Sequence, residues 1–153
     1  MSRVTPNKTV IVSLIAFLGA AALLGAFCRY SWLCGEQIGT YTDMVACAEY
    51  LKEHHERNGE YPSSFLDAMP PELRDGFRSD RWGAPYVYES SPDGYILVSL
   101  GRDGKRDGLD YWGVRDGPVW SDGPTNPGAV NILGQYDADQ VVSDRGWHRH
   151  ASP

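Results

Sequence analysis

The sequence has little positive charge for its length. Among its 153 residues, 14 are Lys or Arg and 20 are Asp or Glu, which gives a formal net charge of −6. Arg3 and Lys8 precede Cys28 and no acidic residue does, so the chain after Cys28 is more acidic still. An acidic surface repels phosphate backbones, and we therefore expect no nucleic-acid partner.

The sequence also lacks the common motifs of nucleophilic catalysis and of thiolate metal sites. It contains no Gly-x-Ser-x-Gly sequence, no phosphate-binding P-loop and no Cys-x-x-Cys pair. Its three cysteines do not have zinc-ligand spacing with any histidine. We identify no catalytic residues and expect a protein that is not an enzyme.

One long segment without charge lies near the N-terminus. Residues 10–28 are nineteen uncharged and mostly apolar residues, which as a helix would span about 28 Å, close to the hydrocarbon thickness of a bilayer. Arg3 and Lys8 precede the segment and favour a cytoplasmic N-terminus. The sequence thus predicts a short cytoplasmic segment at 1–9, a transmembrane helix at 10–28 and a periplasmic C-terminal domain, on a bacterial inner membrane.

A cleaved signal peptide is the alternative reading of the same segment. Phe27 occupies the position before Cys28 where a lipoprotein signal needs a small residue, and a cut after Ala26 would place Leu24 three residues upstream. These positions favour an uncleaved anchor. The rest of the chain is exported in either case.

An amphipathic pattern follows the membrane segment. Apolar side chains recur at helical spacing from residue 41 to 57, with Thr40 as the expected N-cap and Asn58-Gly59 as the expected stop. The apolar stripe consists of Tyr41, Met44, Val45, Ala48, Leu51 and His55. The stripe must be buried against another part of the chain.

Residues 29–40 form the predicted membrane-proximal connection. The stretch contains Gly35 and Gly39 but no proline, so the two helices could form one helix of about 50 residues. In a continuous helix Cys34 and Cys47 would be about 20 Å apart, whereas a bend at a glycine would allow a disulfide. The sequence leaves both alternatives open.

A β-hairpin is expected after the second helix. Residues 86–88 and 95–100 read as strands, separated by the turn-forming sequence at 90–94, and a short helical turn is expected over 65–69. One face of this hairpin would pack on the apolar stripe. The predicted fold class is therefore α+β.

Three segments carry a resemblance to a known family. They are NGEYP at 58–62, DRWGAPYVY at 80–88 and YILVSLGRDGK at 95–105. In this order, after a membrane helix, they resemble the major pseudopilin of the type II secretion system and its type IV pilin-like relatives. The resemblance implies a long N-terminal helix packed on a small antiparallel sheet, with residues 41–153 as the periplasmic domain. It also implies a structural role, with other pseudopilin subunits or secretion-apparatus proteins as partners.

The N-terminus departs from the family pattern. Pseudopilins begin with a basic leader that ends in a glycine, cut by the prepilin peptidase, and carry a glutamate five residues into the mature chain. Here no glycine precedes the apolar segment and no acidic residue lies inside it. We therefore expect no processing by that peptidase. The departure also motivates the alternative function, an exported stand-alone domain that binds a ligand or acts as an unrecognised hydrolase.

The loop at 100–117 contains three Arg-Asp-Gly triplets, and carboxylates on a glycine-rich backbone suit calcium. The resemblance implies a calcium site there, with Asp103 and the carbonyl of Leu100 as ligands. The family's later Asp-Ala-Asp motif matches either Asp110 or the pair Asp137 and Asp139. The alternative is that these Asp-Gly steps are turns only, with arginines pairing the acids.

The last third of the chain carries the tryptophans Trp112, Trp120 and Trp147, for which we expect a role in covering a thin core. The sequence His148-Arg149-His150 lies near the end, where we expect a frayed tail.

Overall fold

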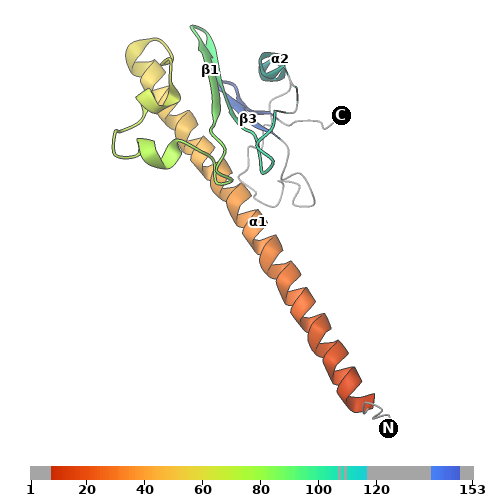
Figure 1. The fold of residues 1–153 in the computed structure, drawn as a ribbon. Coiled ribbons are helices and arrows are strands. Elements are labelled where there is room, and N and C mark those ends of the chain that lie inside the picture. The colour runs from red at the N-terminus through yellow and green to blue at the C-terminus, as the bar shows by residue number, and fades with distance from the viewer. Residues whose placement is uncertain (1–7, 107, 109, 117–138, 149–153) are drawn as a thin grey trace. The chain divides into compact units, whose positions relative to one another are not determined.

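The computed structural model describes residues 8–106, 108, 110–116 and 139–148. The chain divides into two compact units, 1–35 and 36–153. Its elements are α1 (Lys8–Asn58), the short 3-10 helices η1 (Phe65–Ala68) and η2 (Arg74–Phe77), β1 (Val87–Ser91), β2 (Gly94–Ser99), α2 (Tyr111–Arg115), β3 (Gln140–Ser143) and β4 (Gly146–His148). The strands form one antiparallel sheet in the order β1-β2-β3-β4 (Figure 1). The predicted α+β class is confirmed.

Helix α1 is continuous over 51 residues, as the absence of proline allowed. The predicted start at Thr40 is therefore wrong. Thr40 lies inside the helix, fully buried, and its hydroxyl oxygen accepts a hydrogen bond from the backbone N–H of Arg81 at 3.1 Å. The predicted stop is confirmed, because Gly59 has φ +78° and its N–H donates to the carbonyl of His55 at 2.8 Å. Cys34 and Cys47 both lie on α1 and are not joined by a disulfide, so that alternative is not observed.

In the first unit, α1 is the one helix of the described part of the chain that is long and apolar enough to cross a membrane. The most apolar window of α1 is wholly exposed within this chain. Its large exposed side chains include Ile15, Phe17, Leu18, Leu23, Leu24 and Phe27. Such a surface is unfavourable in water, since burial of apolar area contributes about 25 cal/mol per Å².

In the second unit, α1 packs against the sheet through one face. Met44, Cys47 and Leu51 are fully buried and contact Leu97 and Val142 in one core cluster. The predicted stripe thus has the correct helical spacing. The face of α1 that is buried is, however, rotated about the helix axis relative to the predicted one. Its members Tyr41, Val45, Ala48 and His55 are half-buried, whereas polar residues of the stretch 37–43 are buried.

Strand β2 lies in the middle of a three-layer arrangement. Tyr95 and Leu97 point towards the cluster on α1, while Ile96 and Val98 point towards a second cluster on α2. Because both faces are covered, all six residues of β2 are buried. The hairpin predicted at 86–100 is confirmed, with strand bounds shifted by one to three residues.

The second hairpin, formed by β3 and β4, was not predicted. His148 belongs to β4 rather than to a frayed tail; it is buried, and its Nε2 is hydrogen-bonded to the hydroxyl of Ser143 at 2.7 Å. Trp147 lies against Tyr41 of α1, with ring centroids 4.4 Å apart. The expectation that Trp147 covers the core is therefore confirmed, whereas Trp120 lies outside the described residues.

Candidate functional site

The end of the sheet where β2 stops and β3 begins gathers two of the predicted calcium ligands. Val98 pairs with Val141 and Ser99 pairs with Gln140. Continuing this antiparallel register by one step places Leu100 opposite Asp139. Two residues 39 positions apart in the sequence therefore meet at one end of the sheet. The sequence alone could not decide whether Asp110 or Asp139 lies beside Leu100.

Asp139 is a buried acid, with 4% of its surface exposed. One of its carboxylate oxygens, Oδ2, accepts a hydrogen bond from the hydroxyl of Tyr111 at 2.6 Å. The guanidinium carbon of Arg106 lies 5.6 Å from the centre of the Tyr111 ring. A buried carboxylate needs such partners or a cation, because the free energy cost of burying a bare charge is large.

The loop after β2 turns tightly at two glycines. Gly101 and Gly104 have φ of +65° and +63°, and the N–H of Gly104 donates to the carbonyl of Gly101 at 3.3 Å. Asp103 is exposed, and its Oδ1 accepts the backbone N–H of Lys105 at 3.0 Å. This is the turn chemistry that the sequence left as the alternative to calcium binding.

Asp110 is exposed and is the N-cap residue of α2, and its carbonyl accepts the N–H of Val114 at 2.9 Å. Asp137 lies outside the described residues. Among the residues that the structure does describe, no group of three or more His, Cys, Asp or Glu side chains is close enough to hold a metal ion. The structure thus brings together Leu100 and Asp139, and places neither Asp103 nor Asp110 in a three-acid cluster with Asp139.

A second buried acid, Asp80, stabilises this loop through hydrogen bonds. Asp80 is 4% exposed; its Oδ1 accepts the backbone N–H groups of Trp82 and Ala84 at 3.0 and 2.9 Å. Its Oδ2 accepts the hydroxyl of Ser99 at 2.6 Å, and the oxygen of Ser99 accepts the N–H of Gly101 at 3.3 Å. The chain of hydrogen bonds links the 80–84 turn to the start of the glycine loop. The stretch 80–84 was recognisable from the sequence only as part of a motif, and its support of the loop was not predicted.

At the opposite end of the sheet, a buried arginine on α2 joins the β1–β2 turn to the β3–β4 turn. Arg115 of α2 donates from Nε and Nη2 to the carboxylate of Asp144 at 2.7 and 3.0 Å, and from Nη2 to the carbonyl of Asp93 at 2.9 Å. Hydrogen bonding to Asp144 raises the pKa of Arg115 further above its usual value. Arg115 of the last Arg-Asp-Gly triplet therefore binds the β3–β4 turn at shorter distances than its own neighbour Asp116, whose Oδ1 lies 3.5 Å from Nη1. The spacing of the triplets could not have indicated this.

A groove of about 320 Å³ lies between α1 and the β3–β4 turn. Its lining includes the aromatic side chains of Tyr61, Tyr95 and Trp147, with Glu49 and Lys52 from α1. A groove lined by aromatic side chains together with a few charged groups is a common form of binding surface.

A comparison of the chain with models of known families, with curated proteins and with solved structures found no match. The case for a function therefore depends on the residues and their geometry.

Proposed function

We propose that this protein is a non-enzymatic, pseudopilin-like structural protein, anchored in the inner membrane by the N-terminal part of α1. The observation that carries the proposal is that one helix provides both an exposed apolar segment and a buried face under a small sheet. The segment would lie in lipid with the N-terminus in the cytoplasm. The domain of residues 36–153 would lie in the periplasm and contact secretion-apparatus proteins.

A calcium ion at the β2–β3 end is part of the proposal. The carbonyl of Leu100 and the buried carboxylate of Asp139 fit such an ion in chemistry and in register, since calcium prefers oxygen ligands from carbonyls and carboxylates. Asp103, Asp110 or Asp137 would complete the site. The ion would neutralise the buried charge and hold the glycine loop against the sheet, and its binding would add to the free energy of unfolding.

Site-specific cross-linking in the native membrane tests the structural role. A photo-reactive residue at Glu49 or Lys52, on the exposed side of α1 beside the groove, should form adducts with other subunits of the secretion apparatus. The same reagent at Asp75, which is exposed on η2 and does not line the groove, provides the matched position. Adducts that are equal at the two positions, or absent from both, would contradict the proposed contact through this face.

The groove favours one second candidate, an exported stand-alone domain that binds a ligand between α1 and the β3–β4 turn. Under that candidate the protein would be a soluble periplasmic monomer, and substitution of Trp147 by Ala would abolish ligand binding. Recovery of the chain as a soluble monomer from the periplasm would favour it over the anchored structural role.

A further inference from the structure

The stretch of α1 that follows Cys28 is uncharged apart from Arg29, until Glu36. It contains two exposed aromatic residues, Tyr30 at 43% and Trp32 at 57%. Tyrosine and tryptophan are enriched where membranes meet water, because each has an apolar ring and a polar group that can bond to headgroups or water. Arginine near a helix end can extend its charged group towards the same region.

The positions of these aromatic residues around the helix distinguish a lipid from a protein partner. At 100° per residue, Tyr30 and Trp32 lie about 160° apart, on nearly opposite sides of α1. Phe27, also exposed, lies about 60° from Tyr30 and so on the same side of α1 as Tyr30. A protein partner covers one stripe of a helix, whereas a lipid environment surrounds it. Exposed aromatic side chains on opposite sides therefore favour lipid.

The length that a helix needs to cross a bilayer indicates where α1 leaves the membrane on the side of the domain. A helix that crosses about 30 Å of hydrocarbon at an average tilt of about 20° needs about 32 Å, or about 21 residues. Counted from Val10, that length ends at Tyr30. The stretch to Cys28 alone is shorter than a tilted crossing requires.

We propose that Tyr30 and Trp32 bind the phospholipid headgroup region, so that the membrane boundary on the domain side lies at residues 30–32 and not at Cys28. The inference rests on the proposed membrane anchoring and specifies where that anchoring ends. Arg29 would then lie at the hydrocarbon edge, with its guanidinium group extended to the phosphates.

Two native cysteines lie on either side of this boundary. Cys28 and Cys34 are six residues apart, about 9 Å along the helix, which exceeds the thickness of about 5–8 Å of one interfacial layer. Cys28 is exposed within the chain and Cys34 is half-buried. Burial raises the pKa of the Cys47 thiol to about 12, so Cys47 contributes little to the reaction.

The test uses the full chain in phosphatidylcholine vesicles and a charged maleimide that does not cross lipid. The Cys28→Ser variant reports on Cys34, the Cys34→Ser variant reports on Cys28, and the double variant provides the blank for Cys47. Labelling is normalised to the total reached in denaturing detergent. We expect Cys28 to react at least about tenfold more slowly than Cys34, because the reactive thiolate is charged and hydrocarbon disfavours charge.

Removal of the aromatic pair should move the boundary. Tyr30→Ala with Trp32→Ala should raise the labelling rate of Cys28, while Ile38→Ala, at an exposed apolar position beyond the pair, should leave it unchanged. Equal rates for Cys28 and Cys34 in the parent chain would overturn the proposed boundary, as would protection of Cys34 that grows with the ratio of protein to lipid and so reveals a protein partner. A chain that fails to float with the vesicles would overturn the anchoring itself, and with it this inference.

Discussion

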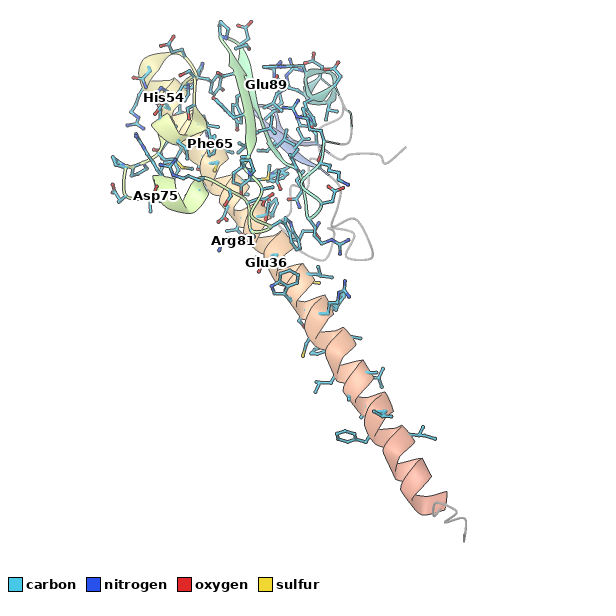
Figure 2. The ribbon with its side chains drawn as sticks, viewed as in Figure 1. Glu36, His54, Phe65, Asp75, Arg81 and Glu89 are labelled. Carbon is cyan, nitrogen blue, oxygen red and sulfur yellow. The ribbon has the colours of Figure 1, made fainter. Side chains whose placement is uncertain are left out.

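Arg81, labelled in Figure 2, binds Asp43 with two hydrogen bonds, from Nε to Oδ2 at 2.7 Å and from Nη2 to Oδ1 at 2.9 Å. Asp43 lies on α1, with 10% of its side chain exposed, and Arg81 lies in the turn that leads to β1. Gly39 gives the arginine its space, because a Cβ there would lie 3.0 Å from Cγ of Arg81. This pair therefore attaches the turn before β1 to a buried polar position of α1.

Replacement of Arg81 by Ala should lower the free energy of unfolding by about 1–2 kcal/mol, because the buried Asp43 would lose a bidentate partner. The loss is limited because the side chain of Arg81 is itself about half exposed to solvent. Lysine at the same position should recover only part of the loss, since it cannot bind both oxygens in a fixed geometry. Thermal unfolding of the full chain in detergent micelles measures the effect. The exposed pair Arg78–Asp75 provides the control, where Arg78→Ala should cost at most about 0.5 kcal/mol. Equal losses at the two arginines would contradict the assignment.

Gly94 is needed at the turn where Arg115 joins the hairpins. A Cβ at Gly94 would meet the guanidinium group of Arg115 and the carboxylate of Asp144. Gly94→Ala should therefore destabilise the domain by about 1–3 kcal/mol, through displacement of a buried ion pair. Gly76→Ala, where a Cβ would meet no atom within 4 Å, is the matched variant and should change stability little. Near-ultraviolet circular dichroism during thermal unfolding would report both, and equal stability of the two variants would exclude a tight contact at Gly94.

Alkaline pH should destabilise the domain. Burial raises the pKa of Tyr88 to about 12 from an ordinary value of 10.0, and that of Cys47 to about 12 from 9.0. Between the ordinary and the raised pKa the native state holds protons that the unfolded state has lost, so stability falls as pH rises. The thermal midpoint should begin to fall near pH 9 and continue to fall to about pH 12. Tyr88→Phe should make the fall shallower above pH 10; an unchanged slope would show that Tyr88 does not contribute.

Calcium should stabilise the protein through Asp139. At a calcium concentration one hundred times the dissociation constant, the expected gain is about 2.7 kcal/mol, which should disappear with a chelator. Asp139→Asn keeps an oxygen that can accept the hydrogen bond of Tyr111 but removes the charge, so it should abolish the calcium-dependent shift. Asp75→Asn, at an exposed acid far along the chain, should retain the shift. A shift that survives in Asp139→Asn would place the ion elsewhere, and identical midpoints with calcium and chelator in the parent chain would exclude the metal.

Local patterns in the sequence predicted the elements whose signals are themselves local. The helical period of Met44 and Leu51, the left-handed stop at Gly59 and the hairpin around Gly94 were all recognisable because they depend on neighbouring residues. The rotation of α1 was not predictable, since Asp43 is buried only because Arg81, 38 positions later, provides its partner.

Strands β3 and β4 were not predicted, because they too depend on contacts with distant parts of the chain. Val141 and Val142 face opposite layers, so the short strand lacks the alternation of apolar and polar residues that indicates a sheet edge. The place of Asp139 opposite Leu100 follows from pairing between β2 and β3, which no local pattern encodes. The sequence therefore predicted the types of residue at the candidate site, but it did not predict which of them lie close together.

Alkaline carbonate extraction followed by mass measurement determines whether α1 anchors an intact chain in the membrane. We expect the protein to remain in the membrane fraction with residues 1–26 still attached, because the apolar window of α1 is wholly exposed within the chain. Recovery of a soluble form that lacks those residues would contradict the account.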